Sequence, residues 1–240
     1  MYVPDMPVRF RALSALLAAA TLLGCIPQQA PDRLPVCERL DDARKQDETP
    51  YHLKLNQQGL TAFPDTVADL HGVVRLSLRG NALGVVSDKI GDCAEVVWMD
   101  LGEAGITALP DAIERLTQLR TLYLSANALA TLPAGFSGLA QLEYLNLDRN
   151  KLTALPENIG RLSSLKWLRL NGNQLATLPP SITELTKLKR LYLRNNRLTV
   201  LPNAIGKLTA LEWLLLEGNP LPQVERDRLR EALPSCQVVF

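Results

Sequence analysis

The chain has 240 residues, of which 47% are hydrophobic and 21% are charged, so it has enough apolar residues to build a folded core. Lys and Arg number 26 against 25 Asp and Glu, which gives a formal net charge of +1. A net charge this close to zero gives no electrostatic argument for a nucleic-acid partner, because proteins bind nucleic acids through basic surfaces.

The first 24 residues have the pattern of an export signal. Arg9 and Arg11 form a positively charged region, and residues 12–23 are mostly apolar or small. This apolar stretch is too short to span a bilayer, which takes ~20 residues. Met6 is an alternative start to Met1 and would place the arginines closer to the terminus. We therefore expect this segment to be a signal peptide.

The signal ends in Leu22-Leu23-Gly24-Cys25, which resembles the bacterial lipoprotein signal. The resemblance implies that Cys25 becomes the lipidated first residue of the mature chain, anchored by more than one acyl chain. Ile26 is not acidic, and by the same resemblance this favours the outer membrane of the cell envelope over the inner one. Two alternatives remain: a plain secretory signal with a coincidental Cys, or a buried apolar helix. A cytoplasmic location applies if the segment is not an export signal.

Residues 25–49 are predicted to form a lipid-anchored linker followed by an N-terminal cap. Val36, Leu40 and Ala43 have the i, i+4, i+7 spacing of one helix face, directly after Pro35. We expect a short amphipathic helix here that covers the open apolar end of the region beginning at Pro50.

A period of 23 residues runs from Pro50 to Leu233 and divides this region into eight copies. The fourth, sixth and eleventh residues are apolar in every copy, and the ninth is Asn except at Gln58 and Ala104. The fifth copy reads L-E-Y-L-N-L-D-R-N-K-L-T-A-L-P-E-N-I-G-R-L-S-S. The copies begin at Pro50, Val73, Val96, Leu119, Leu142, Leu165, Leu188 and Leu211.

This spacing predicts the structure of one copy. The L-x-L pair is typical of a short strand that buries both leucines on one side. The Asn comes where the chain turns, and a stack of such amides can satisfy backbone groups that the turn would bury. Pro156 then favours the start of a short helical turn, from which Ile159 and Leu162 point inward.

The pattern resembles the leucine-rich repeat family, whose signature is L-x-x-L-x-L-x-x-N-x-L in 20–29 residues. The resemblance implies an α/β fold, a right-handed solenoid or horseshoe with a parallel sheet on the concave face and short helical turns on the convex face. This variety of repeat is similar to that of Ras-suppressor and scribble-type scaffolds and of many bacterial surface proteins. Because each copy buries its apolar edge only against neighbours, both ends need caps.

The eighth copy is expected to form the C-terminal cap. Its stretch from Glu225 to Leu233 is charged, with Val224 and Leu229 interspersed, and is predicted to be a closing helix. Residues 234–240 end this cap with an apolar piece.

The second and third copies depart most from the pattern. Ser87 stands where Pro is expected, and Ala104 stands where Asn is expected. We expect local irregularity there without a domain break.

Apart from Cys25, the chain has three cysteines: Cys37, Cys93 and Cys236. Export permits a disulfide. A full copy separates Cys37 from Cys93, and this gap exceeds the ~7 Å between Cα atoms that a bridge allows unless the cap folds over the side. Cys93 occupies a position that is Leu in six other copies, so we expect it to be a small buried apolar residue. Cys236 belongs to the C-terminal cap.

The third and fifth residues of each copy should point to the concave face. All three tryptophans and three of the five tyrosines fall there, and aromatic side chains are typical binding anchors. We expect Trp167 and Trp213 to be substantially exposed, although such rings can also simply cover the strand backbone. The predicted ligand-binding residues are Trp98, Tyr123, Tyr144, Trp167, Arg169, Arg190, Tyr192, Arg194 and Trp213.

Charged residues accompany these rings on the sixth and seventh copies. A basic and aromatic patch could receive an acidic protein segment or a glycan, whereas charges alone are more typical of a solvated face. The basic residues are Lys166, Arg169, Lys189, Arg190 and Arg194, and the acidic residues that flank them are Glu143, Asp148, Glu212 and Glu217.

No catalytic residue, metal ligand or cofactor motif is predicted. His52 and His71 have no partner set by spacing, and no phosphate loop or nucleophile elbow is present. Some bacterial leucine-rich repeat proteins are ubiquitin ligases, but those carry a separate catalytic domain after the repeats. We do not expect that activity here, where Leu233 to Phe240 follow the repeats.

We therefore expect a non-enzymatic protein-binding module on a membrane lipid anchor, with its ligand on the concave face. Two alternatives remain open. The chain could be a structural envelope protein that bridges the membrane to the cell wall or to a neighbouring complex. It could also be an intracellular signalling scaffold if the N-terminus is not an export signal.

Overall fold

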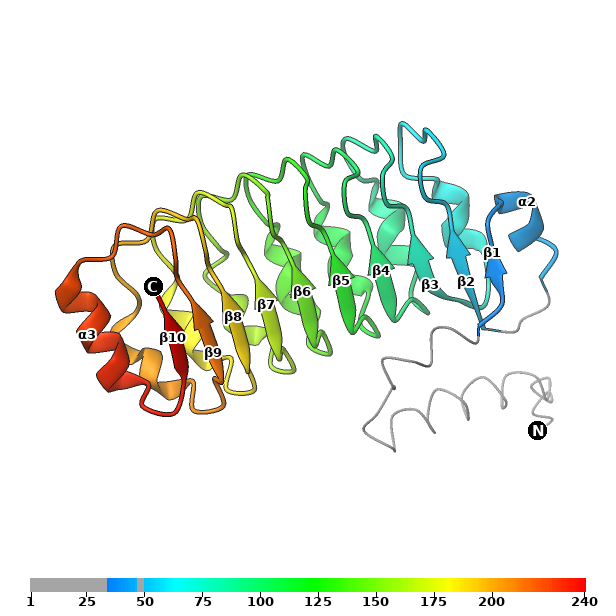
Figure 1. The fold of residues 1–240 in the computed structure, drawn as a ribbon. Helices are drawn as coiled ribbons and strands as arrows, with labels where there is room; N and C mark the ends of the chain where they lie inside the picture. The colour runs from blue at the N-terminus through cyan, green and yellow to red at the C-terminus, as the bar shows by residue number, and fades with distance from the viewer. Residues whose placement is uncertain (1–33, 47–49) are drawn as a thin grey trace, which may run out of the picture.

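The computed structural model describes residues 34–46 and 50–240, so the predicted signal peptide and the predicted lipidation at Cys25 lie outside the described residues. Within the described part, ten parallel strands form one sheet in which each strand lies beside its predecessor in the chain (Figure 1). The strands are β1 (Val36–Cys37), β2 (Tyr51–Lys54), β3 (Val73–Ser77), β4 (Trp98–Asp100), β5 (Thr121–Tyr123), β6 (Tyr144–Asn146), β7 (Trp167–Arg169), β8 (Arg190–Tyr192), β9 (Trp213–Leu215) and β10 (Gln237–Val239).

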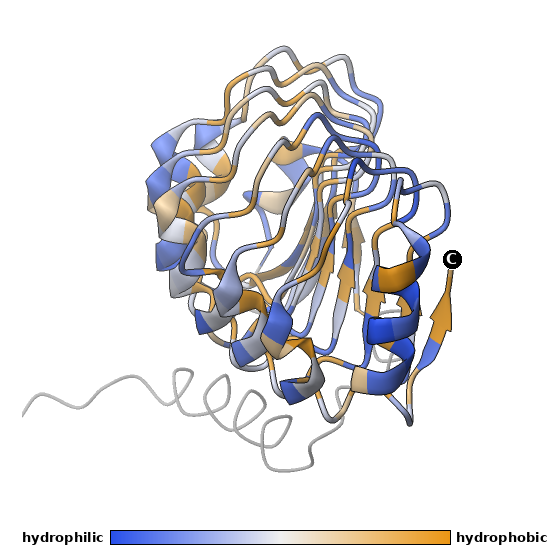
Figure 2. Cartoon of the chain, turned by 90° about the vertical axis from the view of Figure 1, so that its left-hand side faces the viewer, coloured by the Kyte–Doolittle hydropathy of each residue, from blue (hydrophilic) through white to orange (hydrophobic). Residues whose placement is uncertain are grey.

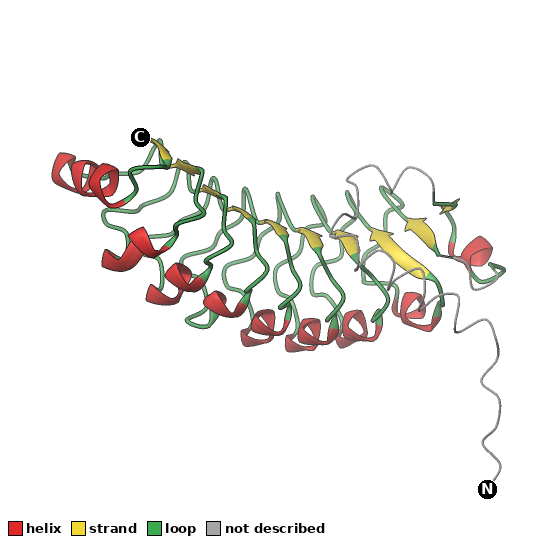
Figure 3. Cartoon of the chain, turned by 90° about the horizontal axis from the view of Figure 1, so that it is seen from below, coloured by secondary structure: helices red, strands yellow, loops and turns green. Residues whose placement is uncertain are grey.

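Short 3-10 helices lie on the side opposite the sheet, and Figure 3 shows the strands on the concave side of the curved body. This arrangement confirms the predicted solenoid. No helix in residues 34–46 and 50–240 is long and apolar enough to cross a membrane. The 3-10 helices are η2 (Asp65–Asp69), η3 (Asp88–Asp92), η4 (Asp111–Arg115), η5 (Ala134–Gly138), η6 (Ile159–Arg161), η7 (Pro180–Glu184) and η8 (Asn203–Lys207).

The core is a continuous column of leucines between the sheet and the 3-10 helices. The fourth and sixth residues of all eight copies are buried, as Leu145 and Leu147 are in the fifth. Ile159 and Leu162 close the same copy from the helical side and are also buried. Alternate strand residues therefore point inward as predicted, and each copy packs its apolar edge on the next one.

The asparagines of the repeats form a hydrogen-bonded stack along the turn. The Nδ2 of Asn150 donates to the carbonyl oxygens of Leu124 at 2.9 Å and Leu147 at 3.0 Å. Its Oδ1 accepts from the backbone N–H of Leu129 at 3.1 Å. One buried side chain thus satisfies backbone groups of two copies, which confirms the role predicted for this position.

The N-terminal cap combines a strand with a short helix. The helix α2 (Leu40–Ala43) buries Ala43 against the core. Val36, however, lies in β1 and is 53% exposed, so the prediction of one helix face that includes Val36 is wrong. This segment forms a strand because the edge of β2 would otherwise have unpaired backbone groups. The backbone N–H of His52, for example, donates to the carbonyl of Pro35 at 2.9 Å.

The C-terminal cap contains the predicted closing helix, α3 (Gln223–Ala232), which Figure 2 shows as mostly hydrophilic at the near end of the solenoid. Leu229 and Leu233 are buried, whereas Val224 is 75% exposed. After the helix, β10 adds a last strand to the sheet. The apolar end of the chain thus extends the sheet as well as the core.

An ion pair within α3, between buried Glu225 and partly exposed Arg228, is hydrogen-bonded to the repeat before it. Glu225 occupies the place of the repeat proline, and its Oε1 accepts from the backbone N–H of Leu201 at 2.9 Å. Arg228 donates to Glu225 at 2.6 Å and to the Leu201 carbonyl at 3.0 Å. Burial acts to raise the pKa of Glu225, but the hydrogen bonds from Arg228 and Leu201 outweigh it and lower that pKa.

The irregular second and third copies keep the sheet continuous, as predicted. Ser87 replaces proline as the residue before η3 and accepts a hydrogen bond from the backbone N–H of Lys89 at 3.1 Å. Where Ala104 replaces Asn, the next residue is Gly105 with a φ of +63°, a left-handed conformation that glycine adopts at low cost.

Cys37, Cys93 and Cys236 are free thiols. Cys93 is buried as predicted, and burial raises its pKa to about 12. Burial also raises the pKa of Cys236 to about 11. Thiols held protonated in this way are packing residues with little nucleophilic character.

Candidate functional site on the concave face

The strands bring the predicted site residues into two rows that run along the concave face. The third residues of neighbouring copies are in register, so that Tyr144 lies beside Trp167, Trp167 beside Arg190, and Arg190 beside Trp213. The fifth residues form a second row that contains Tyr123, Arg169 and Tyr192. The parallel register therefore places residues 23 positions apart at neighbouring points of one surface.

Four rings from four successive strands pack against one another, and we call them the aromatic ladder: Trp98, Tyr123, Tyr144 and Trp167. Successive ring centroids are 5.6, 5.0 and 5.7 Å apart, and the ring planes are tilted by 54°, 40° and 55°. These distances and tilts are favourable for aromatic pairs. In the first row, Thr121 occupies the position between Trp98 and Tyr144. The ring that β5 contributes to the ladder therefore comes from Tyr123 in the second row.

An arginine stacks on each tryptophan at the ends of the ladder. The guanidinium carbon of Arg75 lies 4.2 Å from the ring centroid of Trp98, and that of Arg190 lies 4.3 Å from the centroid of Trp167. The resulting order, Arg–Trp–Tyr–Tyr–Trp–Arg, spans six copies. Arg75 was not among the predicted site residues, although its place as third residue of the second copy could have identified it.

The aromatic residues are half-buried, so the expectation that Trp167 and Trp213 are substantially exposed is wrong. Trp167 loses exposure because it packs between Tyr144 and Arg190. The position of a residue in the repeat gave the direction of its side chain but not the contacts between copies. The rings combine a packed side with a surface open to a partner.

Burial is also the main influence on the titratable groups of this surface. It raises the pKa of Tyr123 and of Tyr144, so both phenols remain protonated donors at neutral pH. His52 contacts Trp98 edge-on, with ring centroids 5.7 Å apart. Burial first, and then the charges of Arg75 and Lys54, lower the pKa of His52 to about 4, so this imidazole is neutral.

Most of the predicted basic patch is neutralised by ion pairs between copies. Lys166 contacts Glu143 at 2.6 Å, and Arg169 contacts Asp148 at 2.6 Å. Lys189 likewise pairs with Glu212 at 3.1 Å, and Arg194 pairs with Glu217 at 2.5 Å. Among the described residues Arg190 has no such carboxylate partner and stacks on an indole instead. The face thus offers aromatic and hydrogen-bonding groups with little net charge.

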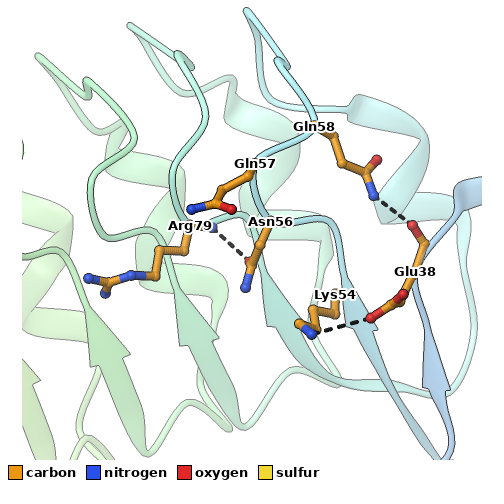
Figure 4. Close-up of a pocket in the computed structure, with 6 residues that line it drawn as sticks. All are labelled: Glu38, Lys54, Asn56, Gln57, Gln58 and Arg79. Atoms are coloured by element: carbon orange, nitrogen blue, oxygen red, sulfur yellow. Dashed lines mark hydrogen bonds and ion pairs between the residues drawn. The ribbon is translucent and has the colours of Figure 1, made fainter.

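A polar recess of about 310 Å³ lies at the N-terminal end of the solenoid, lined by Glu38, Lys54, Asn56, Gln57, Gln58 and Arg79 (Figure 4). Its polar groups bind mostly one another. Lys54 pairs with Glu38 at 3.2 Å, and the Nε2 of Gln58 donates to the Glu38 carbonyl at 2.6 Å. The aromatic ladder is therefore the stronger candidate for a ligand site.

In the part of the chain that the structure describes, no group of three or more His, Cys, Asp or Glu side chains could hold a metal ion. The Nδ1 of His71 lies 4.0 Å from a carboxylate oxygen of Glu95, and the His71 side chain is 82% exposed.

The stacked 23-residue copies and the aromatic concave sheet define a leucine-rich repeat solenoid. Two family models agree: a leucine rich repeat model matches residues 94–152, and a leucine-rich repeat region model matches residues 136–220. The chain is a leucine-rich repeat protein. Domains of this kind commonly act as protein-binding modules and are typically non-enzymatic. No curated protein matches the chain.

Solved structures are similar in fold. The leucine-rich repeat domain of the type III effector XopL is 24% identical, with a TM-score of 0.67, and the match covers 100% of this chain and 97% of that one. The plant peptide hormone receptor RGFR1, solved in complex with RGF2, is 23% identical, with a TM-score of 0.62. That match covers 74% of this chain but only 33% of the receptor.

Proposed function

We propose that this protein is a non-enzymatic recognition module, tethered to the bacterial cell envelope by lipidated Cys25, that binds a protein partner on its concave face. One observation carries the proposal: all three tryptophans and three tyrosines lie half-buried on that face, and four of these rings pack against one another. Aromatic residues with one packed side and one open side are typical anchors of protein interfaces.

The size of the face is consistent with this role. Strands lie about 4.8 Å apart, so the eight copies extend the sheet over roughly 34 Å, enough for an interface of standard size. The plant receptor, whose structure includes RGF2, shares the fold, and a peptide or protein ligand is the partner class we propose here. The neutralised charges favour an aromatic contact over recognition of an acidic segment.

Position-specific photo-crosslinking tests the proposal. A photoreactive phenylalanine analogue is placed at Tyr144 or Tyr192 on the concave face, and at Asn203 in η8 as a matched control on the convex side. We expect a discrete protein adduct in cells from the two concave positions and none from position 203. Adducts from position 203 alone would place the binding surface on the convex side and overturn the proposal.

A further inference from the structure

We propose that the concave face receives a proline-rich segment of its partner in the polyproline II conformation, laid along the solenoid axis across the aromatic ladder. The inference rests on the proposed function and names the chemistry of the bound segment. It comes from three properties of the face: its closed backbone, its hydrogen-bonding character and its spacing.

The sheet backbone offers nothing to a ligand that crosses the face. Strands β4 to β9 each pair with a neighbour on both sides, in an unbroken parallel register. Their N–H and C=O groups therefore lie in the plane of the sheet and are already bonded. A partner cannot bind here by adding a strand, and it meets only side chains.

These side chains donate hydrogen bonds more readily than they accept them. The ladder carries two indole N–H groups, and Arg190 adds a guanidinium. The phenols of Tyr123 and Tyr144 hydrogen-bond to each other, and Tyr144 also bonds to Arg169. Two acceptors nearby already accept hydrogen bonds: Asp100 accepts from the backbone N–H of Gly102 at 2.8 Å, and Asn146 accepts from that of Asp148 at 3.0 Å.

Asp148 is occupied as well. It accepts from Arg169 at 2.7 Å and from the backbone N–H of Asn171 at 2.7 Å. An ordinary peptide brings one N–H per residue and would leave many of them without acceptors on this surface. Proline has a carbonyl and no N–H, so a proline-rich segment matches a face that donates.

The dimensions of the ladder also fit this conformation. Four strands about 4.8 Å apart span about 14 Å from first to last, which a polyproline II segment of about five residues covers at 3.1 Å per residue. One turn of that helix, about 9.3 Å, is close to two strand spacings of about 9.6 Å. Every third ligand residue would therefore meet equivalent positions two copies apart, such as Trp98 and Tyr144.

The tilt of the rings favours a peptide over a glycan. Neighbouring planes meet at 40° to 55°, so each ring is partly covered by the next one. A sugar ring needs a free flat platform. The grooves between tilted rings instead suit the proline rings of a polyproline II helix, which other protein domains also bind in grooves lined by aromatic side chains.

The tryptophans make the test direct, because Trp98, Trp167 and Trp213 are the three tryptophans of the chain and all belong to concave strands. Full-length protein is titrated with a decaproline peptide, with a glycine–serine decamer of equal length and with chitohexaose, while intrinsic fluorescence is recorded. We expect a saturable change with decaproline, and at least tenfold weaker binding of the other two probes.

Two variants of Tyr144 distinguish the contribution of its aromatic ring to binding from that of its hydroxyl. Tyr144→Ala should weaken decaproline binding at least fivefold, Tyr144→Phe should weaken it about twofold, and Asn203→Ala on the convex side should not change it. Thermal melts of each variant show whether the protein is folded, and Tyr144→Leu, which also removes the aromatic ring, replaces Tyr144→Ala if that variant unfolds.

Two results would overturn the inference. The first is no saturation with decaproline while crosslinking still captures a partner at Tyr144, which would leave the proposed function standing with another peptide chemistry. The second is saturation by chitohexaose alone, which would identify a glycan site. Loss of the concave crosslinks themselves would instead mark failure of the proposed function.

Discussion

Arg190 and Trp167 belong to neighbouring strands, and the guanidinium carbon lies 4.3 Å from the indole ring centroid. In a half-buried setting such a cation–π contact contributes about 1 kcal/mol. We expect a double-mutant cycle with Arg190→Leu and Trp167→Leu, measured by denaturant unfolding, to give a coupling free energy of about that size. Additive effects of the two changes would mean that the two side chains do not interact in solution.

The asparagine stack gives a second prediction. Asn150→Ala removes four hydrogen bonds to backbone groups, so we expect the free energy of unfolding to fall by about 1–3 kcal/mol. Asn203→Ala, at an exposed position of η8, serves as the matched control and should change it by less than about 0.5 kcal/mol. Equal effects of both changes would contradict the role given to the stack.

Tyr51 supplies a prediction of opposite sign. Its ring is fully buried at the N-terminal end, and its hydroxyl has no hydrogen-bond partner among the described residues. Burial, together with the proximity of Cys37 and Glu95, raises its pKa to about 12. Tyr51→Phe removes the unsatisfied hydroxyl and keeps the ring, so it should stabilise the protein by about 1 kcal/mol. A lower midpoint of denaturant unfolding would show that the hydroxyl is bonded after all.

The sequence pattern predicted the fold well because each copy repeats the same local choices. The spacing of Leu145, Leu147 and Asn150 predicts a strand, the side of it that faces the core, and the turn that follows. Copies of 23 residues bury their apolar edges by stacking into a solenoid. The N-terminal cap was less predictable. Its residues lie outside the period, and only the open edge of β2 explains why Val36 pairs as a strand.

The site was predictable as a surface but not as a set of contacts. The repeat position of Trp167 and Tyr144 placed both on the concave face. The contacts between these side chains depend on the rotamers that they adopt when neighbouring copies pack together. This applies to the ring stacking, to the arginines at the ladder ends and to the ion pair of Lys166 with Glu143. Those contacts change the predicted basic patch into a nearly neutral, donor-rich face.

The membrane anchor is tested outside the solenoid. If Cys25 is lipidated, the wild-type protein should take up a fatty acid analogue in metabolic labelling and fractionate with membranes. Cys25→Ser should abolish the label and leave the precursor unprocessed, whereas the control Cys236→Ser, which changes a C-terminal cap residue, should label normally. An unlabelled wild-type protein in the cytosol would favour the intracellular scaffold.

The central claim, that the concave aromatic residues bind the partner, is tested most directly at Trp213. This residue lies on the concave sheet beside Arg190, and no ring contact or cation–π contact joins it to other described residues. Affinity for the crosslinked partner and thermal stability are measured together for Trp213→Ala. We predict that binding weakens by more than about 1 kcal/mol while the melting temperature changes little. A large fall in melting temperature with unchanged affinity would contradict the account and make the ring a packing residue.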